Sequence, residues 1–162
     1  MSDIPSIIDK DNVAVTDRTR LLGERGEALA CNYLVNKGYR LVVSNFKVPV
    51  GRNSKGVQVT GEIDIVALDG DTLVFVEVKT RRSDEFLPVI AAVDLRKQRQ
   101  ITRTARIYRR LFSIYDVPHR FDVVTVLLAK NADPVIEHTE GFWSEAVFRK
   151  RAWRDDNWYD AY

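Results

Sequence analysis

The chain has 162 residues, of which 45% are hydrophobic and 30% are charged, with 25 Lys and Arg against 23 Asp and Glu. This balance predicts one soluble domain with its own core, and no apolar run approaches the roughly 18 residues of a membrane span. Cys31 is the only cysteine, which excludes an internal disulfide and a multi-cysteine zinc site; with no visible secretory signal, it predicts a cytoplasmic protein.

The first half of the chain predicts a helix followed by three strands. Residues 1–16 lack periodicity and are expected to form a loose arm. A helix is expected over 17–37, because apolar side chains recur on one face and Gly38 follows as a stop signal. Strands are expected over 39–47, 57–68 and 72–80, with a basic, glycine-containing loop at 49–56 and a turn at 69–71.

The second half predicts a helix and two strands. Residues 88–112 are expected to be mostly helical, 120–129 to form an apolar strand and 135–138 a short edge strand. After Phe142 the chain carries all three tryptophans, and residues 149–162 are expected to form a tail, which leaves a domain over 17–148. A run of strands with helices on either side favours a mixed sheet flanked by helices over a regular βαβ repeat.

Two segments are strongly basic although the chain is nearly neutral. Residues 37–55 hold five basic side chains and residues 96–110 hold seven, with no acidic residue in either. In the expected second helix, five arginines lie opposite the apolar stripe of Ile101, Ala105, Tyr108 and Phe112. They are Arg96, Arg99, Arg103, Arg106 and Arg110. Such a face predicts a polyanionic partner; the alternative is a solvated face that keeps the protein soluble.

The segment 61–80, GEIDIVALDGDTLVFVEVKT, carries the chemistry. The strand 72–80 is nearly continuously apolar, which is typical of a strand buried on both faces. It nevertheless holds Glu77 and Lys79, which project from one face because strand side chains alternate. A turn centred on residues 70–71 places Asp64 opposite Glu77 and Glu62 opposite Lys79. Structural ion pairs at a sheet end are one interpretation of this pattern.

A metal site is the other interpretation. Facing carboxylates repel each other, and a divalent cation that prefers oxygen ligands, such as Mg²⁺, would turn this repulsion into binding. On the first helix, Glu27 flanks the apolar stripe and is better placed than Glu24 to reach Asp64 and Glu77. An ordinary surface glutamate is the alternative for Glu27. His119 and His138 lie in separate elements, so a histidine-based metal site is not expected.

The motifs also resemble a known family. GERGEALACNYLVNKGYRLV, GEIDIVALDGDTLVFVEVKTRR, AAVDLRKQRQ, RFDVV and VIEHT are similar, over residues 20–148, to the YraN-like family of bacterial proteins. This family is assigned to the PD-(D/E)xK nuclease superfamily, with a core similar to that of archaeal Holliday-junction resolvases. The resemblance implies a restriction-endonuclease-like fold with an αβββαβ core. Asp64 follows Ile63 rather than proline, and the connection over 48–60 is longer than usual in the family.

By this resemblance the protein is a Mg²⁺- or Mn²⁺-dependent endonuclease that hydrolyses DNA phosphodiester bonds, with branched DNA as one substrate class. Glu27, Asp64, Glu77 and the Val78 carbonyl would hold the metal, and Lys79 would orient or deprotonate the attacking water. The arginine face, together with Arg52 and Lys55 in the loop 49–56, would bind phosphates. A homodimer would be needed for symmetric cleavage of a four-way junction.

A second hypothesis is a non-catalytic nucleic-acid-binding or adaptor protein on a nuclease-like scaffold. The complete set of carboxylates and lysine argues against it, because a retired site has no physical need of facing carboxylates. Fold alone does not decide between the two.

Overall fold

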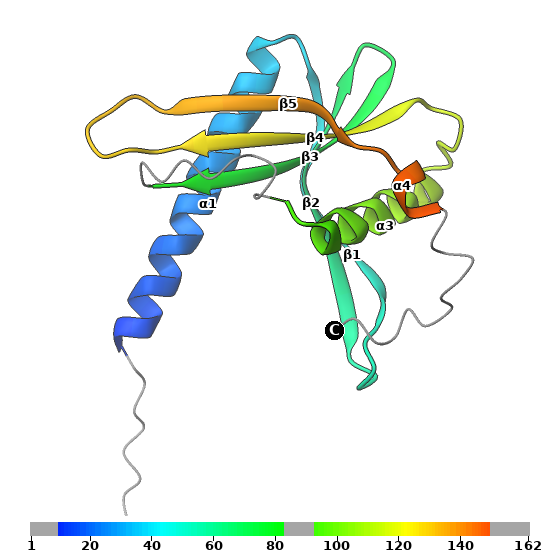
Figure 1. The fold of residues 1–162 in the computed structure, drawn as a ribbon, viewed down its shortest axis with the longest axis horizontal. Helices are drawn as coiled ribbons and strands as arrows, with labels where there is room; N and C mark the ends of the chain where they lie inside the picture. The colour runs from blue at the N-terminus through cyan, green and yellow to red at the C-terminus, as the bar shows by residue number, and fades with distance from the viewer. Residues whose placement is uncertain (1–9, 83–92, 150–162) are drawn as a thin grey trace, which may run out of the picture.

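A five-stranded mixed sheet forms the centre of the computed structural model, which describes residues 10–82 and 93–149 (Figure 1). The strands lie side by side in sequence order: β1 (Arg40–Arg52), β2 (Gln58–Asp69), β3 (Thr72–Arg81), β4 (His119–Leu127) and β5 (Val135–Trp143). All neighbours are antiparallel except β3 and β4, which are parallel. The described helices are α1 (Lys10–Asn36), α3 (Leu95–Leu111) and the short α4 (Ala146–Arg149).

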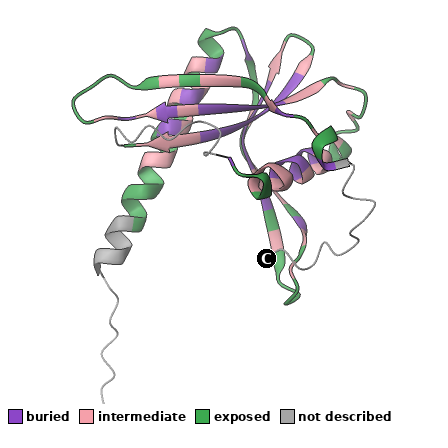
Figure 2. Cartoon of the chain, in the orientation of Figure 1, coloured by how far each residue is buried: buried purple, intermediate pink, exposed green. Residues whose placement is uncertain are grey.

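The two long helices cover opposite faces of the sheet. Ala30 and Leu34 of α1 pack in one apolar cluster with Ile65, Val76 and Val124. A second cluster combines side chains of α3 with those of the other sheet face, among them Ile101, Ala105, Tyr108, Phe75, Phe121 and Val123. The central strands β3 and β4 are buried by both layers (Figure 2). The expected mixed sheet flanked by helices is therefore confirmed.

The hairpin of β1 and β2 does not follow the sheet along its whole length. The pairing of β2 with β3 extends from Asp69↔Thr72 to Ile65↔Val76 and stops there. Beyond this point β2 pairs with β1 as far as Arg52↔Gln58, and the hairpin runs away from β3 beside α3 (Figure 1). The sheet thus divides between β2 and β3.

Several boundaries differ from those expected from the sequence. Residues 10–16 are not a loose arm but the first turns of α1, which nothing interrupts because no glycine or proline lies between Pro5 and Gly23. The loop expected at 49–56 is also wrong, since β1 continues to Arg52. Pro49 is tolerated because β1 is an edge strand, and a register shift between Pro49 and Gly51 absorbs the irregularity.

The end of the domain also differs. β5 extends to Trp143, whose buried ring stacks on Phe121 at 4.8 Å between centroids, so this tryptophan belongs to the core. Phe112, expected in the buried stripe, is 57% exposed because it caps the end of α3. The expected tail 150–162 lies outside the described residues, as do residues 1–9 and 83–92. No helix in the described part of the chain is both long and apolar enough to cross a membrane.

Candidate functional site

The candidate site lies where β2 and β3 separate. Asp64 and Glu77 are the first residues beyond the last paired residues, Ile65 and Val76. Continuing the register would pair Asp64 with Glu77, as the turn geometry predicted, but the strands diverge at this level. We call the place defined by Asp64, Glu77 and Val78 the fork.

The backbone of β1 is irregular at the level of the fork. Ser44 pairs with Ile65 and Phe46 pairs with Ile63, so Asn45 lies level with Asp64. Asn45 has a positive φ of 54°, which asparagine tolerates better than most residues. The face of β2 switches at the same level, because Ile65 packs in the cluster of α1 and Ile63 in the cluster of α3.

Asp64 spans the fork. Its side chain is largely buried, and its Oδ2 accepts a hydrogen bond of 2.7 Å from the main-chain N–H of Val78. Burial and the negative charge of Glu77 raise the pKa of Asp64 to about 7, whereas the Val78 hydrogen bond and Lys97 lower it. Asp64 is therefore a carboxyl group whose charge is poorly compensated, as expected for facing acids.

Glu77 lies between two lysines. It is only 2% exposed, and its Oε1 lies 2.8 Å from Nζ of Lys79 while its Oε2 lies 3.4 Å from Nζ of Lys97. The contact with Lys97 is an ion pair without hydrogen-bond geometry, so Oε2 has no hydrogen-bond partner among the described residues. Glu77 and Lys79 share a face as expected, and the ion-pair interpretation holds for this pair. Glu62 instead pairs with Lys47 of β1, at 3.2 Å.

The oxygen atoms at the fork partly match the ligand set of a hard cation. Glu77 Oε2 is a buried oxygen without a hydrogen bond, and Asp64 has a second carboxylate oxygen beside the one that Val78 engages. The N–H and C=O of one strand residue point to the same side, so the Val78 carbonyl faces the fork together with its N–H. Such oxygens, completed by water, are ligands that Mg²⁺ prefers.

Glu27 stands apart from this set. Its Oε2 accepts a hydrogen bond of 2.9 Å from Nδ2 of Asn45, and its charge contributes to the raised pKa of Asp64. Within the described residues, no three His, Cys, Asp or Glu side chains come close enough together to hold a metal ion. Direct ligation by Glu27 thus remains a prediction, whereas its position near the fork agrees with the helix-face argument. Glu24 is exposed and paired with Arg20.

The arginine face of α3 is more engaged than the sequence predicted. Arg106 Nε lies 2.5 Å from Glu145 Oε1, and the guanidinium of Arg99 lies 5.7 Å from the centre of the Phe148 ring. No acidic residue lies within the helix segment itself, as the sequence showed, but Arg106 finds an acidic partner in a distant segment. The guanidinium of Arg103 packs against Gly51, and Arg96 and Arg110 are exposed.

Of the two residues of the hairpin turn that were predicted to bind phosphate, Arg52 forms a hydrogen bond within the turn itself. Arg52 Nη1 donates to the Gly56 carbonyl at 2.7 Å, and Asn53 Oδ1 accepts from the N–H groups of Lys55 and Val57. Lys55 is exposed at the tip. Contact of either residue with nucleic acid remains a prediction.

Sequence reasoning missed two residues of the site. Lys97 lies in the first turn of α3, where the Asp94 side chain caps the helix by accepting from the Lys97 N–H at 2.8 Å. Its approach to Glu77 depends on a contact between segments 20 residues apart, which no local pattern encodes. Asn45 could have been noticed as an amide between the apolar residues Val43 and Phe46 of an expected strand.

The fold and the fork define an α/β protein whose sheet divides at two buried carboxylates and two partly exposed lysines. The model of the uncharacterised protein family UPF0102 matches residues 26–126, and the chain belongs to this family, which is the YraN-like family expected from the motifs. A UPF0102 protein of Geotalea uraniireducens is 44% identical over 117 residues, which cover 72% of this chain and 84% of the relative.

A UPF0102 protein of Trichlorobacter lovleyi is 42% identical over 134 residues, which cover 82% of this chain and 91% of the relative. Among solved structures, the crystal structure of SSO0001 is similar with a TM-score of 0.38 and 18% identity. The match covers 88% of this chain and 63% of that chain, so it spans less than two thirds of the solved protein.

Proposed function

We propose that the protein is a metal-dependent endonuclease of the PD-(D/E)xK type that hydrolyses phosphodiester bonds in DNA. One observation carries the proposal. Two buried carboxylates, Asp64 and Glu77, meet where the sheet divides, and one of their oxygens has no hydrogen bond. Lys79 and Lys97 offset the charge of Glu77, but burial and repulsion from Glu77 still disfavour the charge of Asp64.

Asp64, Glu77 and the Val78 carbonyl would hold Mg²⁺ or Mn²⁺, with Glu27 contributing directly or through water. Such an ion, when bound, polarises the scissile phosphate and favours formation of hydroxide. Neighbouring groups of the protein hold the two carboxylates in position. Asp64 is held by Val78, and Glu77 is fixed by Lys79 at 2.8 Å and by Lys97 at 3.4 Å.

Lys79 has the role nearest to the reacting atoms. Its side chain is one-third exposed and pairs with Glu77. In this proposal it would orient the attacking water and balance the negative charge that develops on the phosphate. Lys97 is the second cation on Glu77 and is a positioning residue in this proposal.

A non-catalytic nucleic-acid-binding or adaptor function is the second candidate, and one observation favours it. The charge of Glu77 is already met by Lys79 and Lys97, and within the described chain no third acid joins Asp64 and Glu77 closely enough to complete a metal cluster. In that case the fork would be a structural cluster, and its acids would not need a cation.

One experiment separates the two functions. Purified protein is incubated with single-stranded, duplex, flap and four-way-junction DNA, with Mg²⁺, with Mn²⁺ and with EDTA. Metal-dependent cleavage that Asp64→Asn abolishes supports the nuclease. Asp71→Asn is a matched control, because this exposed aspartate lies in the turn at the other end of β3. Binding to DNA without cleavage in any metal would favour the adaptor.

A further inference from the structure

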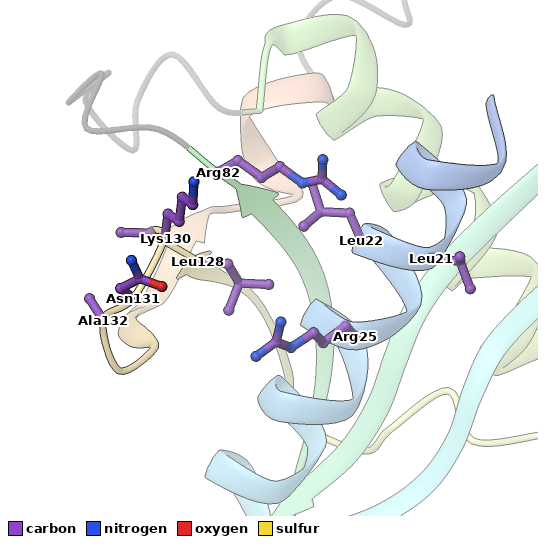
Figure 3. A pocket seen from close by; sticks show the side chains of 9 residues that line it. Leu21, Leu22, Arg25, Arg82, Leu128, Lys130, Asn131 and Ala132 are labelled. Atoms are coloured by element: carbon purple, nitrogen blue, oxygen red, sulfur yellow. The ribbon is translucent and has the colours of Figure 1, made fainter. Parts of the chain in front are cut away.

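A basic cavity of about 640 Å³ lies beside the C-terminal end of β3, outside the fork (Figure 3). Three segments form it: α1, the end of β3 with Arg82, and the turn after β4. Each segment contributes one cation, namely Arg25, Arg82 and Lys130, and no lining residue is acidic. A volume in the range of roughly 300–1,000 Å³ is typical of small-ligand sites.

The three cations have no visible structural purpose in the described part of the chain. None of them forms an ion pair or a side-chain hydrogen bond with another described residue. Like charges gathered around one cavity repel each other. An anion seated between them would remove this repulsion, and the delocalised guanidinium groups of Arg25 and Arg82 suit phosphate oxygens.

The remaining lining specifies more than a bare phosphate. Figure 3 shows Leu128 between the cationic side chains, and Leu22 of α1 lines the same cavity. Asn131, which has a positive φ of 60°, adds an amide that both donates and accepts. Cations, an apolar floor and one amide together match a phosphate, a sugar and a base edge.

The place of the cavity relates it to the fork. Arg82 follows Glu77 by five residues on or just beyond the same strand, which corresponds to roughly 16 Å of extended chain. The cavity lies toward α1, whereas Glu77 pairs with Lys97 of α3. Helix α1 borders both places, since Arg25 lines the cavity and the charge of Glu27 acts on Asp64. We propose that the cavity binds one nucleotide through its phosphate, as a unit of the strand whose scissile phosphate lies at the fork. The choice of a strand rests on the proposed function; a free mononucleotide offers the same chemistry.

Binding without cleavage tests the inference. A short fluorescein-labelled oligothymidylate is titrated by anisotropy in EDTA at several salt concentrations, and thymidine 5′-monophosphate is titrated separately by calorimetry. The test variant is Arg25→Gln with Lys130→Gln. The matched control, Lys37→Gln with Arg40→Gln, also removes one arginine and one lysine, at the other end of the sheet, where Lys37 contacts Glu140, His138 and the Tyr33 ring.

We expect the cavity variant to bind the oligonucleotide roughly ten-fold more weakly or worse, and its slope of log affinity against log salt to fall by about 1–1.5. Loss of mononucleotide binding alone would assign the cavity to a free nucleotide. Affinities and slopes equal to those of the control, or no binding of either probe to the wild type, would overturn the site. Lys130→Gln alone provides the same comparison if the double variant does not fold.

The outcome is distinguishable from that of the proposed function. If the wild type cleaves DNA and the cavity variant binds like the control, the nucleotide site is rejected and the nuclease function is retained. If the wild type never cleaves DNA and the cavity variant loses binding, the nucleotide site is retained and the nuclease function is rejected.

Discussion

Asp64 Oδ2 accepts a hydrogen bond of 2.7 Å from the main-chain N–H of Val78, across the point where their two strands stop pairing. A side chain here takes the place that a main-chain carbonyl of β2 would hold in a continuous ladder. The bond links β2 to β3 at the fork, where the carboxyl groups of Asp64 and Glu77 lie. The same bond also lowers the pKa of Asp64, so the strand geometry and the charge of this carboxyl group are coupled.

The first prediction concerns pH and Asp64. Its pKa is raised from 3.8 to about 7 in the folded state, so the fold favours the protonated form. This group contributes stability below about pH 4, and the contribution is lost as the pH rises through about 7. From this group alone, the free energy of unfolding in EDTA should fall by of the order of 4 kcal/mol between these limits.

Urea denaturation of wild type and of Asp64→Asn across this pH range measures the effect. The variant should lose most of the fall, because asparagine still accepts from Val78 but carries no charge. Asp71→Asn should behave as the wild type. Excess Mg²⁺ should stabilise the wild type at pH 8 and leave Asp64→Asn unchanged. Parallel pH curves for wild type and Asp64→Asn would contradict the raised pKa.

The second prediction concerns the repulsion between the two acids. Replacing Glu77 by glutamine removes the negative charge that, after burial, contributes most to the raised pKa of Asp64. The pKa of Asp64 should fall in Glu77→Gln, as measured by carbon-detected NMR titration of its carboxyl group. Cleavage should fall by about 100-fold or more. A pKa that stays in place would show that burial alone raises it.

The third prediction separates the two lysines. Lys79→Met should lower cleavage by about 100-fold or more at every pH, because its ammonium acts at the reacting phosphate and water. Lys97→Met should instead raise the pKa of Asp64 further, since Lys97 lowers it in the wild type, and should shift the pH–rate profile upward. Lys47→Met, which breaks an exposed pair with Glu62, is the control for both. Identical pH profiles for Lys79→Met and Lys97→Met would show that the two lysines do not have different roles.

The fourth prediction divides the arginines of α3 by their partners. Replacing Arg99, Arg103 and Arg110 by glutamine should reduce the salt slope of DNA binding by about 2–3, because each phosphate contact on duplex DNA releases roughly 0.9 counterion. Arg106→Gln should leave the slope nearly unchanged and lower the free energy of unfolding by about 1–2 kcal/mol, because Glu145 loses its closest partner. An unchanged slope in the triple variant would place DNA contacts elsewhere.

The fifth prediction concerns the seat of α1 on β3. A Cβ at Gly26 would lie 1.8 Å from Oγ1 of Thr80, whereas one at Gly23 would meet nothing within 4 Å. Gly26→Ala should lower the free energy of unfolding by about 1–3 kcal/mol through overpacking. Gly23→Ala, one turn earlier on the same helix, should raise it by about 0.8–1 kcal/mol through helix propensity. Chemical denaturation of the two variants side by side gives both signs.

Much of the fold could be predicted because its signals are local. The alternation in 61–80, the two-residue turn and the shared face of Glu77 and Lys79 depend on neighbours in sequence, and the register from Asp69↔Thr72 onward follows from them. The divergence after Ile65↔Val76 could not be read in the same way. It coincides with the positive φ of Asn45 in β1, a strand that pairs with the other edge of β2.

The missing parts of the site have the same origin. Lys97 reaches Glu77 from another layer, and Glu145 reaches Arg106 from a segment 39 residues later. A helical wheel shows which side of α3 an arginine occupies, but it carries no information about what packs there. The start of α1 was missed for a different reason: its first turns lack an apolar stripe, so periodicity had nothing to detect.

The outer strand β5 bears on how two copies of the chain could meet. It pairs with β4 alone, so one row of its main-chain groups is free of strand partners within the described sheet. An edge of this kind invites a second copy to extend the sheet, and natural proteins discourage such extension with charged side chains. Glu137 is exposed on β5, so two such edges would bring like charges together, whereas the charge of Glu140 is offset by Lys37 and Arg120. The charge of Glu137 thus disfavours a homodimer formed by pairing of two β5 strands.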